Sequence, residues 1–393
     1  MPSSWQKAYD ELKGFISNNT SIEIGANVVC ISSDVRPEFY RLFNTVCVRF
    51  IKETFPDLLK ESCVMSKNWG EISQKLMGGL KLESIDVDTT IKWFLLDPKD
   101  GLTRGLFDSL FDLLKGKNDL SAFEQAADRL VKDEFTRCCR EGYQCWSIVA
   151  LLHLLSTDKV YHLPVTDFDM NPSLQPEELY GRRQENVPHA VETNRISFVH
   201  NIMYSFLIPR VIGHSTRLNY FTAFCRDFNY SEVRWRARDL SPEQEWFGIS
   251  DIVRDFGRGD LWPDLAIYTG SYHSKLVVIA DYFKMARPDI IVEFRVEKDW
   301  YEKEGLEPIR RHYNVLKPRL GSFVVCREPV PKTALQELEP KPELHQPEAI
   351  GAAIRPTYKP APDIHLLSVG YDIPKLEPIV DTMLKGITSQ GRL

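Results

Sequence analysis

The chain has 393 residues, of which 43% are hydrophobic and 26% are charged. This composition is typical of a folded protein with two or three domains, and it excludes disorder of the whole chain. The formal net charge of −6 excludes a general attraction to nucleic acid or anionic lipid, so either partner would require a local basic patch.

The sequence carries no signal of secretion or membrane insertion. The first residues, MPSSWQKAYDELKGF, lack the basic and then apolar order of a signal peptide. The longest apolar run, CWSIVALLHLL at 145–155, is about half the roughly 20 residues that cross a bilayer. The eight cysteines include no CxxC pair, which is typical of reduced thiols. We therefore expect a cytoplasmic protein without a membrane partner.

Residues 1–155 are predicted to form a mainly α-helical domain. The segment 36–61 begins with an early proline and has apolar residues at helical spacing. Ser4 and the Ser121–Glu124 pair are candidate helix caps. One strand-like segment, SIEIGANVVCIS at 21–32, interrupts the helices. Amphipathic helices of this kind predict a packed bundle rather than a catalytic domain.

Residues 156–240 are predicted to be a connection followed by a basic segment. Residues 156–193 are polar with little periodicity, which favours a long irregular connection. Between 194 and 238, seven arginines face two acids, a local charge of +5. In EVRWRARD, an extended chain would place three guanidinium groups on one face. These groups belong to Arg234, Arg236 and Arg238.

Two interpretations of these three arginines stay open. They could bind the phosphates of DNA or RNA, with the intervening tryptophan stacking on a base. They could instead form a solvated strand face whose arginines pair with neighbouring acids.

Residues 241–328 carry the predicted elements of an α/β domain. SPEQEWFGISDIVRDFG at 241–257 has the cap residues of a helix. LWPDLAIY, KLVVIADYF and DIIVEFRV are predicted strands. A helix over about 299–317, with a break near Gly305, and a buried strand at 322–328 complete the order α-β-β-β-α-β.

After this domain the composition changes again. Eight of the chain's 24 prolines lie in 329–362, which predicts an extended Pro-rich linker. Residues 363–393 follow as a small C-terminal element, in which DIHLLSVGYD is predicted to be a strand and LEPIVDTMLKGI a short helix.

Glu293 lies in the middle of the strongly apolar strand DIIVEFRV. Strand periodicity places four apolar side chains on one face and the side chains of Asp289, Ile291, Glu293 and Arg295 on the other. An isolated buried charge costs several kcal/mol, so Glu293 and Arg295 must be solvated, paired or bound to metal.

Two Pro-Asp pairs and an acid-x-base triplet give this domain a resemblance to a known family. Pro263-Asp264 precedes the first strand, Pro288-Asp289 precedes the third, and the triplet is Glu293-Phe294-Arg295. With the α-β-β-β-α-β order, they resemble the PD-(D/E)XK nuclease superfamily, and in particular compact bacterial endonucleases that repeat Pro-Asp. The resemblance covers about residues 241–328 and implies a metal-dependent nuclease, of the kind found in defence or restriction systems.

The resemblance implies that Asp264 and Glu293 hold Mg²⁺ or Mn²⁺ against a phosphodiester. Such ions prefer carboxylate oxygens, polarise a phosphoryl group and lower the pKa of an attacking water. The family's lysine is replaced by Arg295, which is always protonated and cannot act as a general base, but can stabilise negative charge. Lys298 could supply the family's positive group from another position. Other candidates for it lie in the following helix, at Arg310 and Arg311.

The metal partner of Glu293 depends on the segment 274–286. If 275–283 is a strand between two hairpins, Asp264 and Glu293 lie two strands apart, about 9–10 Å, which is too far to share one ion. If 274–286 is a helix, the two acids fall on neighbouring parallel strands. A third arrangement makes Asp281 the partner acid across a hairpin.

The sequence therefore predicts an α+β protein with a mainly helical N-terminal domain, a nuclease-like α/β domain and a Pro-rich C-terminal tail. The predicted function is metal-dependent hydrolysis of DNA or RNA, with the arginines of 194–238 holding the phosphate backbone. The alternative is a nuclease-like nucleic-acid-binding or scaffold protein that has lost catalysis. Arg295 in place of the lysine favours this alternative.

Overall fold

The structure is a computed structural model that describes most of the chain as two compact units. The described residues are 3–26, 28–162, 190–199, 211–226, 246–248, 263–273, 276, 280–281, 284–338 and 363–389. Unit 1 comprises Met1–Gln74 and Asp86–Trp146, and unit 2 comprises Lys75–Ile85 and Ser147–Leu393.

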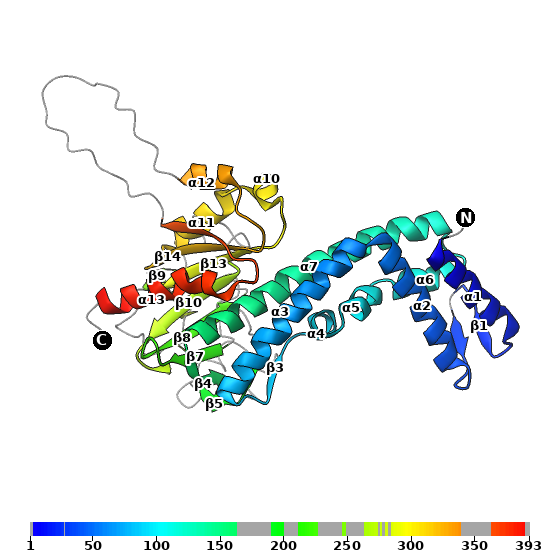
Figure 1. The fold of residues 1–393 in the computed structure, drawn as a ribbon, viewed down its shortest axis with the longest axis horizontal. Coiled ribbons are helices and arrows are strands. Elements are labelled where there is room, and N and C mark those ends of the chain that lie inside the picture. The colour runs from blue at the N-terminus through cyan, green and yellow to red at the C-terminus, as the bar shows by residue number, and fades with distance from the viewer. Residues whose placement is uncertain are drawn as a thin grey trace, which may run out of the picture. The chain divides into compact units, whose positions relative to one another are not determined.

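Unit 1 is mainly helical, as predicted for this part of the chain (Figure 1). Its helices are α1 (Ser4–Asn18), α2 (Arg36–Thr54), α3 (Pro56–Leu80), α4 (Thr89–Leu96), α5 (Pro98–Arg104), α6 (Phe107–Leu114) and α7 (Leu120–Leu154), of which α3 and α7 continue into unit 2. A hairpin of β1 (Ile22–Ile24) and β2 (Val29–Ile31) confirms the predicted strand segment. The core is rich in aromatic contacts, such as that of Phe43 with Phe111 at 4.5 Å between ring centroids.

Two helices of unit 1, α1 and α7, are capped by residues that precede the predicted caps. Ser3 caps α1 in place of Ser4, because its side chain accepts a hydrogen bond from the backbone N–H of Gln6 and the Gln6 side chain accepts one from Ser3. Asp119 takes the place of Ser121 at α7, where its carboxylate accepts from a first-turn N–H at 2.7 Å. Both oxygens satisfy donors that a helix start leaves unpaired.

Unit 2 is built on a mixed eight-stranded sheet with the order β15-β14-β13-β10-β8-β7-β4-β5 (Figure 1). Its strands are β4 (Thr157–His162), β5 (Val191–Thr193), β7 (Val211–Ser215), β8 (Tyr220–Arg226), β10 (Leu265–Gly270), β13 (Ile290–Arg295), β14 (Gly321–Cys326) and β15 (Ile364–Ser368). Neighbouring strands are antiparallel, except that β13, β14 and β15 run parallel. Every residue of β10, β13 and β14 is buried, so both faces of the sheet are covered there.

Two smaller sheets accompany the main one. β3 (Ser84–Asp86) pairs with β6 (Arg195–Ser197). β9 (Trp246–Gly248), β11 (Ala280–Asp281) and β12 (Lys284–Ala286) form a three-stranded sheet in the order β11-β12-β9.

Two helices connect β13 to β14 and cover one face of the main sheet. They are α10 (Trp300–Glu304) and α11 (Glu307–Leu316), and Gly305, with a φ of 63°, separates them as predicted. Trp300 and Ile309 pack with Val324 and Cys326 of β14. The helices therefore cover the face to which these two β14 side chains point.

Three elements complete the C-terminal part of unit 2. They are α12 (Lys332–Leu338), the 3₁₀ helix η4 (Ile373–Leu376) and α13 (Glu377–Ser389). Strand β15 and helix α13 confirm the predicted C-terminal strand and helix, and β15 also adds a strand to the main sheet. Within the predicted Pro-rich linker, 332–338 is helical, and Ala334 lies in the core of α10, α11 and β14. Residues 339–362 lie outside the described part of the chain.

Within 241–286 the structure contradicts the predicted helix and one of the alternatives left open for 274–286. Residues 246–248, predicted as helix, form β9 and pair with β12, because the Trp-Phe pair suits a strand once a partner is present. Residues 280–281 form β11 within the predicted strand 275–283, so the alternative of a helix over 274–286 is not observed. The sheet of β11 and β12 is separate from the main one, so this segment does not lie between β10 and β13.

The prediction of an irregular connection over 156–193 is wrong where the structure describes it, because β4 and β5 of the main sheet lie there. Two further strands of this sheet, β7 and β8, come from the predicted basic segment. Strands from three predicted segments, 156–240, 241–328 and 363–393, thus share one sheet. The fold class is mixed α+β, as predicted. Among the described helices, we find none with the length and apolar character needed to cross a bilayer, and the cytoplasmic location stays a prediction.

We expect Gly101→Ala to destabilise unit 1. A Cβ at Gly101 of α5 would lie 2.6 Å from Cα of Phe94 in α4, and a backbone atom cannot move aside as a side chain can. Overpacking of this kind costs about 1–3 kcal/mol, which denaturant unfolding would measure. Gly105→Ala is the control, since a Cβ there meets nothing within 4 Å. Equal unfolding free energies for the two variants would contradict the described helix contact.

Candidate functional site

Asp264 lies directly before β10 and faces the middle of β13. Leu265 pairs with Val292 in the antiparallel register, which places Asp264 beside Glu293. The Oδ2 atom of Asp264 accepts a hydrogen bond from the backbone N–H of Phe294 at 2.8 Å. The first Pro-Asp pair therefore places a carboxylate on the strand that neighbours the Glu-Phe-Arg triplet.

Glu293 and Arg295 point to the face of the sheet that α10 and α11 cover. In the parallel register they pair with Val324 and Cys326, and paired residues share a face. The predicted alternation of faces is confirmed, but both faces are buried. The exposed fractions of the Asp264, Glu293 and Arg295 residues lie between 2% and 7%, so their charges are compensated by pairing rather than by solvent.

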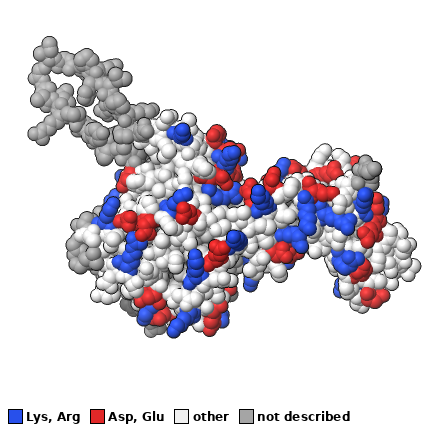
Figure 2. Space-filling model, in the orientation of Figure 1, with Lys and Arg blue, Asp and Glu red and all other residues white. Residues whose placement is uncertain are grey.

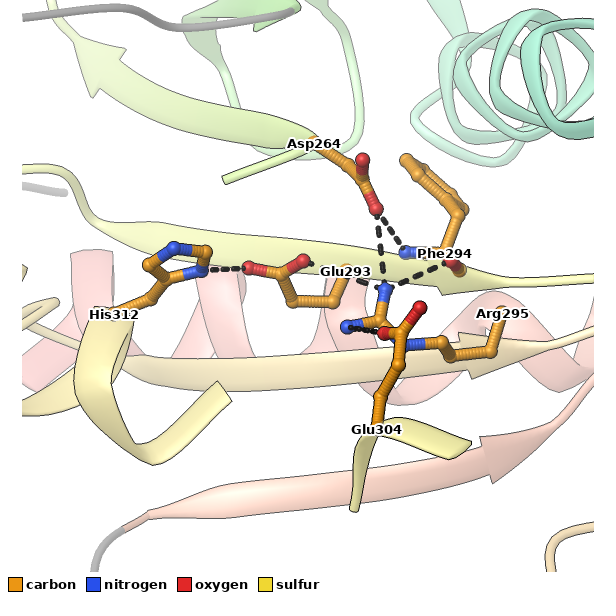
Figure 3. Close-up of polar contacts among 6 residues, drawn as sticks. All are labelled: Asp264, Glu293, Phe294, Arg295, Glu304 and His312. Atoms are coloured by element: carbon orange, nitrogen blue, oxygen red, sulfur yellow. Dashed lines mark hydrogen bonds and ion pairs between the residues drawn. The ribbon is translucent and has the colours of Figure 1, made fainter. Parts of the chain in front are cut away.

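The guanidinium of Arg295 lies between the two carboxylates (Figure 3). Its Nη1 is 3.5 Å from Asp264 Oδ2 and 3.6 Å from Glu293 Oε2, and its Nη2 is 3.5 Å from the exposed Glu304 at the end of α10. We call the point occupied by Arg295 Nη1 the cation position. The two acids that the sequence predicts as metal ligands converge on it.

The contacts of Arg295 are longer than those of a bidentate ion pair. Charge-assisted N–H···O bonds are usually about 2.7–2.9 Å long, whereas three ion-pair distances at Arg295 are 3.5 Å or more. Its Nη1 also donates to the carbonyl of Phe294 at 3.0 Å. Its Nε is buried and has no hydrogen-bond partner among the described residues. The guanidinium thus compensates the acids without using all of its donors.

His312 of α11 completes the site and was not predicted. Its Nδ1 lies 2.5 Å from Glu293 Oε1, and the His312 and Glu293 side chains are both buried (Figure 3). The signal for it was present in the sequence, because His312 lies three residues from Ile309 and Val315 on the buried stripe of α11. A polar side chain on such a stripe needs a buried partner.

The environment raises the pKa of the Glu293 carboxyl above its usual value. Removal from water is the largest cause, and the nearby charge of Asp264 acts in the same direction. The hydrogen bond and charge of His312 and the charge of Arg295 oppose this rise. Glu293 is therefore a carboxyl whose charge depends on the cations around it.

The second Pro-Asp pair has a different place in the structure. Asp289 Oδ2 accepts hydrogen bonds from the backbone N–H and hydroxyl of Thr269, at 2.6 and 2.7 Å. Its Oδ1 forms an ion pair with Arg319, which precedes β14. Asp289 thus ties together the ends of three central strands, which is a structural role.

The other candidate groups do not join the cation position. Arg310 pairs with Glu337 of α12 at 2.5 Å. Lys298 and Arg311 are exposed. Asp281 lies in the separate three-stranded sheet, where its backbone is opposite that of Lys284 in the β11–β12 register, so the arrangement that makes it the partner acid across a hairpin to β13 is not observed.

The predicted basic face falls outside the described residues. Arg234, Arg236 and Arg238 belong to that undescribed part. Among the described arginines of the basic segment, Arg195 pairs with Glu83 at 2.8 Å, and Arg217 pairs with two acids of α13. On the face shown in Figure 2, basic and acidic side chains are interspersed over the described surface.

The described residues contain no group of three or more His, Cys, Asp or Glu side chains that could hold a metal ion. A site at the cation position would therefore take two protein carboxylates, those of Asp264 and Glu293. Comparison with known proteins adds no relative: no family model matches the sequence, and neither a curated protein nor a solved structure matches it significantly.

We expect Asp289→Asn to lower the free energy of unfolding by about 3–5 kcal/mol, because it leaves Arg319 without its buried partner. Denaturant unfolding followed by circular dichroism measures this change. Glu83→Gln is the control, since it breaks the solvent-exposed pair with Arg195 and should change stability little. If Asp289→Asn is as stable as Glu83→Gln, the second Pro-Asp pair does not anchor the sheet.

Proposed function

We propose that unit 2 is a metal-dependent nuclease that hydrolyses phosphodiester bonds of DNA or RNA. The observation that carries the proposal is that Asp264 and Glu293, from neighbouring strands, converge on one cation position. Neighbouring strands lie about 4.8 Å apart, so acids on adjacent strands are close enough to share one ion. Acids two strands apart, at about 9–10 Å, would be too distant.

The order of strands around the site supports the same proposal. β8, β10 and β13 are antiparallel neighbours, and α10 and α11 then lead to the parallel strand β14. Within the main sheet this is a β-β-β-α-β run, with Asp264 directly before its second strand and Glu293 on its third. The first strand of the run is β8, from the predicted basic segment, and the run does not use 275–283.

The donor atoms at the cation position fit a hard divalent ion. Asp264 Oδ2 and Glu293 Oε2 are carboxylate oxygens, the ligands that Mg²⁺ and Mn²⁺ prefer. A divalent ion held there would supply polarisation of a phosphoryl group and a lowered pKa for an attacking water. The two carboxylates would bind that ion in place of the guanidinium that now balances their charge.

Arg295 would stabilise negative charge that develops on the phosphate. It is always protonated and so does not take up a proton from water. Glu304 offers an acceptor for its Nη2 on the side away from Asp264 and Glu293, and the ring centroid of Trp300 lies 5.9 Å from its Cζ. These contacts can hold the guanidinium beside the acids when a second cation binds.

A non-catalytic nucleic-acid-binding or scaffold protein is the second candidate. The observation that favours it is that Arg295 already occupies the cation position between buried acids. In that case the network around Arg295 serves only to compensate buried charge, and unit 2 binds a partner without cleaving it.

Three variants separate these candidates. Glu293→Gln should lower cleavage by at least about 100-fold, because it removes a ligand charge while keeping the side-chain shape. Asp264→Asn should act in the same direction. Arg295→Lys should preserve or raise cleavage, since it restores the family's usual residue. Cleavage of single- and double-stranded DNA and RNA with Mg²⁺ or Mn²⁺ measures all three.

Two results would contradict the nuclease proposal. One is a wild-type protein that cleaves none of these substrates with either ion, together with an inactive Arg295→Lys variant. The other is metal-dependent cleavage that persists unchanged in Glu293→Gln, which would place the activity elsewhere in the sample. Circular dichroism of each variant shows whether the fold is retained.

The nucleic-acid contact is proposed to involve Arg234, Arg236 and Arg238. Changing all three to alanine should weaken binding of a fluorescent oligonucleotide and flatten its dependence on salt, because each phosphate contact releases counterions. Arg195→Ala is the control, since Arg195 pairs with Glu83. An unchanged salt slope in the triple variant would remove this face from the interface.

A further inference from the structure

The two oxygens of the Glu293 carboxylate have different partners. Oε1 lies 2.5 Å from Nδ1 of His312, and Oε2 lies 3.6 Å from Nη1 of Arg295. A carboxylate that binds a metal ion is ionised and can only accept hydrogen bonds, so in the metal-bound site Nδ1 of His312 would donate to Oε1. One oxygen is thus engaged by α11, and the other is left facing the cation position (Figure 3).

The packing of α11 keeps His312 in this place. Ile309, Val315 and Leu316 are buried on the same stripe of the helix, so the backbone at His312 is held against the sheet. Glu293 is 2% exposed, and little water can reach the hydrogen bond to compete with it. Rotation of the carboxylate to present both oxygens would break a short buried hydrogen bond, which costs free energy.

We infer that His312 is a positioning residue that limits Glu293 to a single ligand oxygen and so makes the cation position selective for Mn²⁺ or Mg²⁺ over Ca²⁺. This inference rests on the proposed metal site and adds its ion selectivity. Mg²⁺ takes six ligands in near-octahedral geometry, whereas Ca²⁺ takes six to eight and often binds a carboxylate through both oxygens. A carboxylate with one oxygen engaged suits the first kind of ion.

A purely structural His312 would behave differently. If its only role were to compensate the buried charge of Glu293, its loss would lower stability and weaken the binding of every ion by a similar factor. A positioning role changes the ratio of two affinities, because only Ca²⁺ gains from the released oxygen. The ratio of the Mn²⁺ and Ca²⁺ affinities therefore distinguishes the two roles.

The test is calorimetric titration of the full chain with MnCl₂ and with CaCl₂, without substrate. His312→Leu removes the donor, whereas His312→Asn retains an N–H donor close to the place of Nδ1. His214→Leu is a matched control, since it removes a histidine whose Nδ1 lies 2.6 Å from Asp158, on β7 and outside the site. Should the leucine variant at 312 not fold, His312→Met supplies the apolar replacement.

We expect wild type, His312→Asn and His214→Leu to bind Mn²⁺ more tightly than Ca²⁺ by the same factor. In His312→Leu that factor should fall by about 10-fold or more, the usual scale for loss of a partner of a metal ligand. Two results would overturn the inference but not the proposed metal site. One is an unchanged ratio of Mn²⁺ to Ca²⁺ affinity in the apolar variants of His312. The other is a ratio that falls as far in His312→Asn as in the apolar variants. Absence of binding by wild type for both ions would overturn the proposed metal site, and the inference with it.

Discussion

The compensation of charge between β10 and β13 is the constraint on which the arrangement of unit 2 depends. Two carboxylates and a guanidinium lie in the covered centre of a sheet, where an unpaired charge would cost several kcal/mol. Each acid has a partner from a different element. The Asp264 carboxylate accepts from the β13 backbone, and Glu293 shares a short hydrogen bond with His312 of α11. The helices that follow β13 are therefore needed to keep its charges buried.

The two carboxylates and Arg295 also bear on which cation the site would bind. Two acids that converge on one nitrogen create a place for a positive charge, and Arg295 fills it with contacts of 3.5 and 3.6 Å. A divalent ion offers twice the charge and forms shorter contacts with carboxylate oxygens. The exposed Glu304 offers the guanidinium another partner. Metal binding would then be an exchange of one cation for another rather than the filling of an unbalanced acidic pocket.

Local signals predicted the elements near the site well. The apolar strands DIIVEFRV and SFVVCRE are β13 and β14, and the break at Gly305 separates α10 from α11. That Glu293 must be paired, solvated or metal-bound also followed from its place in an apolar run. Its closeness to Asp264 was expected only with a helix over 274–286 and parallel strands, whereas β10 and β13 are antiparallel neighbours and 280–281 is a strand. Periodicity gives the face of a residue but not the order of strands.

Long-range pairing is the part that local patterns did not predict. β8 lies next to β10 although 38 residues separate their ends, and β15 joins the sheet from beyond the predicted linker. The cap signals of 241–257 favoured a helix, but a pairing with β12 made 246–248 a strand. Glu304 at the end of α10 contacts Arg295, and His312 of α11 contacts Glu293. These contacts depend on how the two helices pack on the sheet rather than on spacing in the sequence.

We propose above all that the position of Arg295 Nη1 is a site for a divalent ion. Anomalous diffraction from crystals of the full chain soaked in MnCl₂ tests it most directly. We expect a manganese peak between Asp264 Oδ2 and Glu293 Oε2, with the guanidinium moved toward Glu304. Crystals that show no peak there, with Arg295 still bridging the two acids, would contradict it.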